Sequence, residues 1–105
     1  MFTGALPQGR GKAPGTLAAH YAPRTSLLVT SAPQEEALRL RQQGLRVAVL
    51  DNPGNVADYA RVLYAELRRL DGLGLDVLVA ERAPEAGLGR ALNDRLARAA
   101  FGSGS

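Results

Sequence analysis

The residues best suited to chemistry near the start of the chain are His20, the sole histidine, and Tyr21 beside it. Their side chains offer hydrogen-bonding groups and flat ring faces. They lie in the stretch APGTLAAHYAPR, between Pro14 and Pro23. Proline favours extended backbone and disfavours a helix at the residue before it. Two interpretations follow: a linker with two incidental side chains, or an extended segment that reaches a second surface.

Two further candidates follow predicted strands, where open α/β sheets bind ligands. Asp51 stands where a ribose-binding carboxylate would lie, but the loop TSAPQEE after the first strand has no glycine and cannot cradle a pyrophosphate. Gly87-Leu88-Gly89 opens the last helix, whose N-terminus could attract an anion, although Glu81 and Glu85 would repel phosphate. The favoured interpretations are therefore a turn-initiating aspartate and a close approach of helix to sheet.

The remaining acids suggest no catalysis. Glu35, Glu36, Asp58 and Glu66 are expected on exposed helix sides, without the spacing of paired carboxylates or metal ligands. Cysteine is absent, which excludes disulfides, thiolate zinc sites and cysteine nucleophiles. Residues 25–100 alone are therefore expected to form a binding or scaffold domain with no cofactor of its own.

Three large side chains on the predicted helices receive structural interpretations. Tyr59 is expected in the core, and Tyr64 at a sheet edge or against a partner. Arg95 flanks a buried helix face, where an arginine usually has a fixed partner, so a structural ion pair or a helix-end contact is expected.

Length and charge place the chain among small globular proteins. It has 105 residues, 46% hydrophobic and 22% charged, with a net charge of +3. The arginines alternate with acids, so direct binding of nucleic acid is not expected. No apolar run approaches the roughly 18 residues of a membrane span, and no signal peptide is visible, so we expect a cytoplasmic protein with no membrane partner.

The hydrophobic pattern predicts three strand–helix units. Apolar runs at 27–29, 47–50 and 77–80 predict strands, and spacings of three and four predict helices over 35–43, 56–70 and from about residue 88. Ser31 and Gln34 have the spacing of a capping box, Asn55 is placed to cap the second helix, and Leu88, Leu92, Leu96 and Ala99 are expected on one buried face of the last.

This pattern predicts an α/β fold. Strands that are apolar at every position are buried on both faces, which favours a parallel sheet of about three strands in a three-layer sandwich with helices on its faces. Residues 1–24 have the proline and glycine content of a linker, 25–100 form the domain, and 101–105 are expected to be a flexible tail. The edges of so narrow a sheet need a cover, and weak pairing between copies of the chain is one way to supply it.

Three stretches carry a family resemblance. They are APG followed by HYAPR near the N-terminus, YARVLYAELRRLDGLGLDVLVAE at 59–81, and PEAGLGRALNDRLARAA at 84–100. In this order they resemble the interdomain linker and C-terminal domain of the two-domain threonylcarbamoyl-AMP synthases. The resemblance covers about three quarters of the chain and implies a Rossmann-like fold.

The family makes threonylcarbamoyl-adenylate from L-threonine, bicarbonate and ATP, for threonylcarbamoyladenosine in tRNA. The resemblance implies that ATP and magnesium belong to an N-terminal catalytic domain that this sequence does not contain. It also implies a linker that lies over that domain's active site and helps to close it. The matching positions are Pro14, Gly15, His20, Tyr21, Ala22 and Pro23, and all of them except Ala22 are expected to contact the bound substrates.

The sequence departs from the family at two places. Thr16 to Ala19 stand where some members carry a lysine and aromatic residues, and DNPGN replaces a longer segment that often contains another strand. We therefore expect a non-catalytic domain whose partner is the catalytic domain of such a synthase. Two alternatives stay open: a regulatory module that binds a nucleotide or amino acid near Ser31, Asp51 and Gly87, and a structural or oligomerisation module.

Overall fold

The computed structural model describes residues 22–104, which form the three strand–helix units that the pattern predicts. The order of the elements is β1 (Ser26–Thr30), α2 (Pro33–Gln42), β2 (Val47–Leu50), α3 (Val56–Asp71), β3 (Val77–Glu81) and α4 (Leu88–Phe101).

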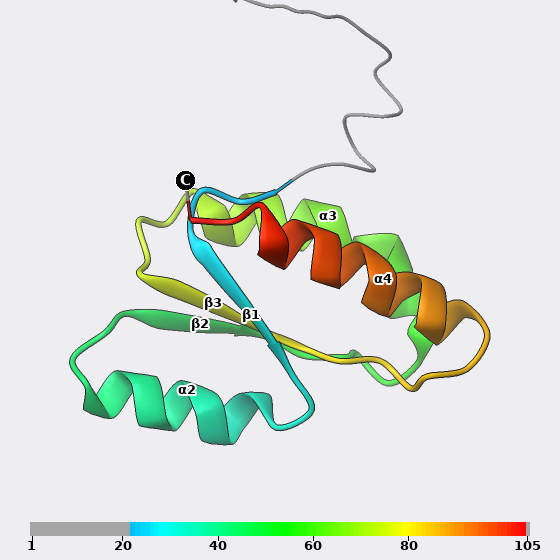
Figure 1. Cartoon of the computed structure of the whole chain (residues 1–105), viewed down its shortest axis with the longest axis horizontal. Coiled ribbons are helices and arrows are strands. Elements are labelled where there is room, and N and C mark those ends of the chain that lie inside the picture. The colour runs from blue at the N-terminus through cyan, green and yellow to red at the C-terminus, as the bar shows by residue number, and fades with distance from the viewer. Residues whose placement is uncertain (1–21, 105) are drawn as a thin grey trace, which may run out of the picture.

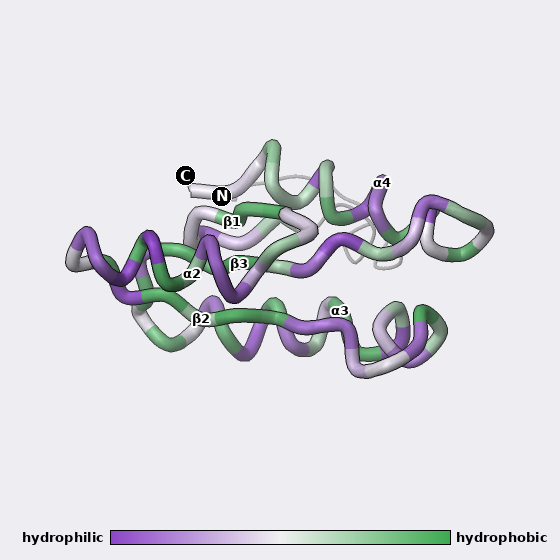
Figure 2. Tube along the Cα trace, turned by 90° about the horizontal axis from the view of Figure 1, so that it is seen from below, coloured by the Kyte–Doolittle hydropathy of each residue, from purple (hydrophilic) through white to green (hydrophobic). Residues whose placement is uncertain are grey.

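The three strands form one parallel sheet in the order β1-β3-β2, so the last strand lies in the centre. Helix α2 covers one face of the sheet, and α3 and α4 cover the other (Figure 1). The chain runs from β1 through α2 to β2, past the position of β3, and then returns through α3 to β3. Both crossovers are right-handed but run in opposite directions along the sheet, so α2 and α3 lie on opposite faces. Figure 2 shows α4 along the β1 side and α3 along the β2 side. The predicted three-layer α/β fold is confirmed.

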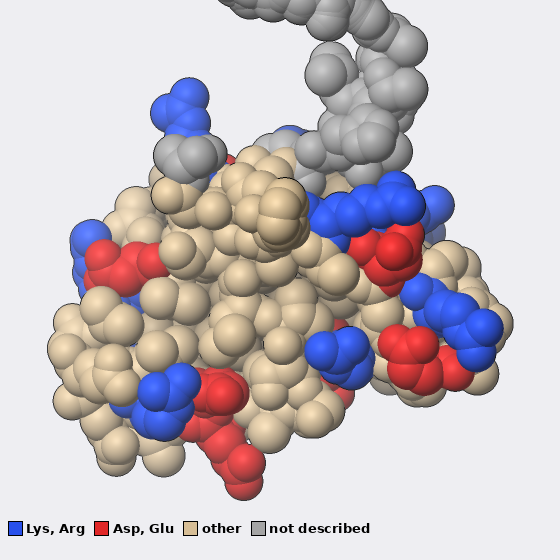
Figure 3. Space-filling view, viewed as in Figure 1, with Lys and Arg blue, Asp and Glu red and all other residues tan. Residues whose placement is uncertain are grey.

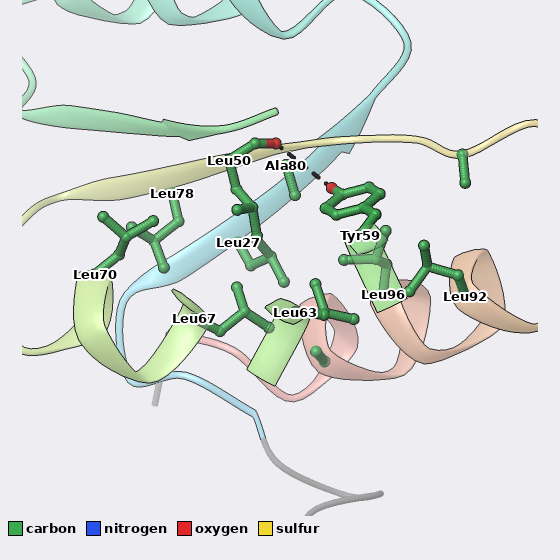
Figure 4. Packing of buried hydrophobic residues seen from close by; sticks show 12 residues of the cluster. Leu27, Leu50, Tyr59, Leu63, Leu67, Leu70, Leu78, Ala80, Leu92 and Leu96 are labelled. Atoms are coloured by element: carbon green, nitrogen blue, oxygen red, sulfur yellow. Dashed lines mark hydrogen bonds between the residues drawn. The ribbon is translucent and has the colours of Figure 1, made fainter. Parts of the chain in front are cut away.

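The long helix α3 forms as its sequence dictates. The Asn55 side chain accepts a hydrogen bond from the Asp58 amide at 2.8 Å, which confirms the predicted cap. Tyr59, Leu63 and Leu67 recur at spacings of four and are almost fully buried. Their stripe packs against the sheet together with α4 (Figure 4).

The start of α2 differs from the prediction. Ala32 is the N-cap and provides no side-chain hydrogen bond, so the capping box of Ser31 and Gln34 is wrong. Pro33 begins the helix instead, because its missing N–H needs no partner at that position. The Thr30 hydroxyl accepts a hydrogen bond from the Ala32 amide at 3.1 Å and shapes the turn.

Two hydrophobic clusters form the core, one on each face of the sheet. The smaller lies under α2 and contains Ala37, Leu40, Val47 and Val79. The larger lies between the sheet and the helices α3 and α4, and its buried members are Leu27, Leu50, Tyr59, Leu63, Leu67, Leu70, Leu78, Ala80, Ala83, Leu92, Leu96 and Ala99. Leu88 is 49% exposed, against the expectation that it shares the buried face of α4.

The chain itself covers part of both sheet edges. The Arg41 guanidinium donates to the carbonyl of Val47 on β2 at 3.0 Å, and the amide of Leu27 on β1 donates to the Ser103 hydroxyl at 2.9 Å. Helix α4 includes Phe101, and Ser103 after it contacts β1.

Candidate functional site

The carboxyl ends of β2 and β3 are joined by polar side chains. Asp51 accepts a hydrogen bond from the side chain of Gln34 at 3.2 Å, and the Glu81 carboxylate accepts one from the amide of Asn52 at 2.7 Å. Tyr59 donates its hydroxyl proton to the carbonyl of Glu81 at 2.6 Å. Burial raises the pKa of the Tyr59 phenol, and the charges of Glu81 and Asp51 raise it further. Tyr59 is therefore a neutral structural brace, as its expected core position implies.

The crossovers reverse between β1 and β3, which is where doubly wound sheets usually open a ligand crevice. Here the Arg82 amide donates to the carbonyl of Thr30 at 2.9 Å and continues the sheet by one residue. A shallow hollow of about 240 Å³ lies nearby, lined by Ala32, Glu35, Glu36 and Arg39. Its charges are largely paired, because Arg39 and Glu36 form an ion pair at 2.6 Å. This end of the sheet therefore offers no positive cradle for a nucleotide.

The start of α4 packs closely on the loop that follows β3. A Cβ atom built on Gly89 would lie 1.9 Å from the Pro84 carbonyl oxygen, so only glycine fits there. The buried Asn93 side chain accepts from the amide of Ala83 and donates to its carbonyl, both at 2.8 Å, and also donates to Glu85. Gly89 is therefore a point of close approach, but α4 meets the loop after β3 there and not the sheet that the sequence suggests.

A second shallow hollow, of about 270 Å³, lies along this part of α4. Its lining consists of Arg82, Glu85, Arg90, Asn93, Asp94 and Ala97. Opposite charges are interspersed in it, and Asp94 pairs with Arg98 at 3.0 Å. Across residues 22–104, no group of three or more histidine or acidic side chains is arranged to hold a metal ion.

The most elaborate polar cluster holds the segment by which the chain enters the domain. Asp71, the last residue of α3, accepts hydrogen bonds from the Arg24 amide at 3.2 Å, from the Thr25 amide at 2.9 Å and from the Thr25 hydroxyl at 2.7 Å. Thr25 is 9% exposed, and the Pro23 side chain is fully buried. This end of the predicted linker is therefore part of the folded domain.

The residues after α4 complete this cluster. The Gly104 amide donates to the carbonyl of Pro23 at 3.3 Å, and the Ser103 hydroxyl donates to the carbonyl of Ala100 at 2.7 Å. The same hydroxyl accepts from the amide of Leu27. A Cβ atom on Gly102 would lie 3.0 Å from that of Ala22, so the two segments touch. We call the set Pro23, Thr25, Asp71, Ser103 and Gly104 the clasp.

Of the predicted linker contacts, only Ala22 and Pro23 fall within the described residues, and Pro14, Gly15, His20 and Tyr21 lie outside them. The Pro23 side chain is buried within the domain, and its expected contact with a partner's active site stays a prediction. Arg95 is exposed, contrary to the partly buried position expected for it. Sequence reasoning missed Asp71 and Ser103, and the only local signal at Asp71 is an acid at the C-terminal end of a helix, where basic residues are usual.

The surface carries no single-sign patch on the face shown in Figure 3, where arginines and acids lie beside each other around an uncharged central area. The ion pairs of α3 are of this kind: Arg61 lies 2.7 Å from Asp58 and lowers the pKa of that carboxyl. None of the helices within residues 22–104 has both the length and the apolar composition to cross a bilayer.

Comparisons with known proteins agree on one family. Residues 3–101 match the family model described as "Threonylcarbamoyl-AMP synthase, C-terminal domain". The threonylcarbamoyl-AMP synthase of Pyrococcus abyssi (strain GE5 / Orsay) is 33% identical over 107 residues, which cover 84% of this chain and 32% of the relative. The crystal structure of P. abyssi Sua5 complexed with L-threonine matches with a TM-score of 0.68 and 29% identity, over 78% of this chain and 30% of that one. The chain thus spans about a third of the length of these relatives.

Proposed function

The chain belongs to the family of threonylcarbamoyl-AMP synthase C-terminal domains, and on this premise we propose that it is a non-catalytic domain that docks on a synthase catalytic domain and helps to close its active site. The reaction served is the formation of threonylcarbamoyl-adenylate from L-threonine, bicarbonate and ATP, for tRNA modification in the cytoplasm. ATP and magnesium would bind the catalytic domain, with no direct contact between tRNA and this chain.

The observation that carries the proposal is the extent of the family match. It spans residues 3–101 and so includes the predicted linker positions Pro14, Gly15, His20 and Tyr21 as well as the folded domain. Residues 22–104 hold no metal-binding cluster, and their polar groups at the carboxyl ends of the strands are engaged in bracing the fold. A folded domain that continues into the linker suits a role in closure.

The physical advantage of such a linker lies in entropy and in the exclusion of water. A proline-bounded, extended segment loses less conformational freedom on docking than a free coil does. A segment that closes over a reactive adenylate keeps water away from it and so prevents its hydrolysis. His20 and Tyr21 supply ring faces and hydrogen-bonding groups toward the substrates or the rim of the site.

The test is a binding isotherm of this chain against the catalytic domain of the P. abyssi synthase, with and without ATP and L-threonine. We expect binding that strengthens with substrates, and weaker binding when His20 and Tyr21 are both changed to alanine. Gln42→Ala, at an exposed position near the end of α2, is the matched control and should bind as the unmodified chain does. The proposal is wrong if the purified chain makes threonylcarbamoyl-adenylate by itself, or if the catalytic domain shows neither binding nor a change of rate.

A further inference from the structure

The clasp at the start of the domain has a consequence for the linker that precedes it. We propose that Asp71 is a positioning residue for the linker: it fixes the point and direction at which the chain leaves the domain toward the catalytic partner. The residues after α4 close the clasp, so the C-terminal segment 102–104 belongs to the same device. This inference rests on the proposed function and adds the residues that would transmit it.

The geometry around Asp71 is that of a holding site. Both oxygens of one carboxylate are used, Oδ2 by the Arg24 amide and Oδ1 by the Thr25 amide and hydroxyl. Hydrogen bonds to a charged group are stronger than neutral ones. Three donors from two successive residues fix the backbone in position and in orientation, which a single contact would not do.

The position of Asp71 in its helix supports a role outside helix stability. A carboxylate in the last turn lies near the negative end of the helix dipole, which disfavours it. The two residues at 68 and 69 are arginines, the type that favours this end. Asp71 is unfavourable for its own helix but accepts three hydrogen bonds from residues 46 and 47 positions away in the chain. Its place is therefore explained by these long-range contacts.

The other side of the clasp is supplied by the end of the chain. Gly104 and Ser103 bind backbone groups of Pro23 and Leu27, which lie on either side of the residues that Asp71 holds. A Cβ atom on Gly104 would lie 3.0 Å from the Ser26 hydroxyl oxygen, so the C-terminal segment and the start of β1 are in close contact. Pro23 is buried between these contacts and has a fixed φ. The first described residues, at the end of the linker, therefore have little freedom to pivot.

The test uses the whole chain in two variants and one control. Asp71→Asn keeps the size of the side chain and removes the charge, and Thr25→Val keeps its shape and removes one donor. Asp76→Asn is the matched control, because Asp76 also accepts a backbone amide, that of Arg46 at 2.7 Å, away from the linker. Amide hydrogen exchange by NMR reports on the clasp, and a binding isotherm with the P. abyssi catalytic domain reports on positioning.

We expect the amides of Arg24 and Thr25 to exchange at nearly the rate of unprotected amides in Asp71→Asn, because a clasp that is mostly open no longer protects them, and to keep part of their protection in Thr25→Val, with no change in Asp76→Asn. Affinity for the catalytic domain should fall about tenfold in Asp71→Asn if the clasp is then closed in one molecule in ten. It should fall less in Thr25→Val and stay unchanged in Asp76→Asn. If both aspartates only stabilised the fold, the two variants would bind the catalytic domain equally well, because affinity is measured on folded chains.

Three results would overturn the inference. Unchanged exchange in both variants would mean that Asp71 does not hold the segment. Faster exchange with unchanged affinity would mean that the clasp does not position the linker, and the proposed function would survive. If the unmodified chain itself does not bind, the proposed function fails first and this inference with it, which the unmodified isotherm reveals.

Discussion

The close contact at Gly89 provides the sharpest test of the packing described above. In an exposed helix, replacing glycine by alanine stabilises by about 1 kcal/mol. At Gly89 the added methyl would stand 1.9 Å from the carbonyl oxygen of Pro84 and 3.0 Å from its carbonyl carbon. The backbone of α4 and the loop would have to separate by more than 1 Å, since real Cβ contacts are essentially never shorter than 3.0 Å.

The loop cannot move at low cost. Asn93 ties the loop to α4 through both the amide and the carbonyl of Ala83, and all these groups are buried. Separation would strain or break these bonds, each costing about 1–3 kcal/mol when a buried partner is left unsatisfied. Overpacking by one methyl costs about 1–3 kcal/mol in its own right. After the helix propensity is subtracted, we expect Gly89→Ala to lower the free energy of unfolding by about 3 kcal/mol.

The assay is thermal and urea unfolding of the whole chain. A loss of this size lowers Tm by roughly 12–24 °C, at about 4–8 °C per kcal/mol for a domain of this size. Gly72→Ala is the control, because Gly72 has a φ of −83° and its Cβ would make an ordinary contact of 3.6 Å with the Arg69 carbonyl oxygen. That variant should be neutral or slightly stabilised. If Gly89→Ala is as stable as Gly72→Ala, the close approach of helix and loop is refuted.

Four further outcomes are expected. Tyr59→Phe should lower the free energy of unfolding by about 1–2 kcal/mol in urea titrations, because the Glu81 carbonyl loses its buried donor. Because burial raises the Tyr59 pKa, its contribution is complete below the unfolded value of about 10 and declines as pH rises above it; urea midpoints at pH 8 and 11 should therefore converge between this variant and the unmodified chain, and parallel curves would contradict the assignment. Asn93→Ala should cost about 2–3 kcal/mol and Asp94→Ala almost nothing by calorimetry, since Asn93 is 6% exposed and the ion pair of Asp94 is open to solvent. Asn55→Ala should lower the free energy of unfolding by about 1 kcal/mol and so lower the Tm measured by circular dichroism, whereas an unchanged Tm would argue against the cap. Millimolar ATP or L-threonine should leave the Tm of the isolated chain unchanged, because both ligands are expected to bind the catalytic domain. A ligand that bound this chain and was present at 100 times its Kd would add about 2.7 kcal/mol of stability, and a raised Tm would therefore contradict this expectation.

Much of the fold could be predicted from local pattern. The three apolar runs, the stripe from Tyr59 to Leu70 and the cap at Asn55 are all found as expected, because periodicity and capping depend on residues within a few positions of one another. The errors at Ser31 and Leu88 lie at helix starts, where the choice of the first turn depends on how the preceding loop packs.

The candidate site was predictable only in part. Family resemblance directs attention to His20 and Tyr21, which lie outside the described residues, whereas the contacts that the structure supplies belong to Asp71 and Ser103. Their partners lie 46 and 76 positions away along the chain, and no local pattern pairs them.

The sequence by itself determined the alternation of strands and helices, the parallel sheet and the family, since apolar runs, caps and shared stretches are written in neighbouring residues. Tertiary structure alone decided that β3 lies between β1 and β2 and that Gly89 meets Pro84. It also decided that the end of α3 and the residues after α4 both hold the start of the domain. These features depend on which distant surfaces meet when the two hydrophobic clusters are buried together, and burial is a property of the whole packed chain.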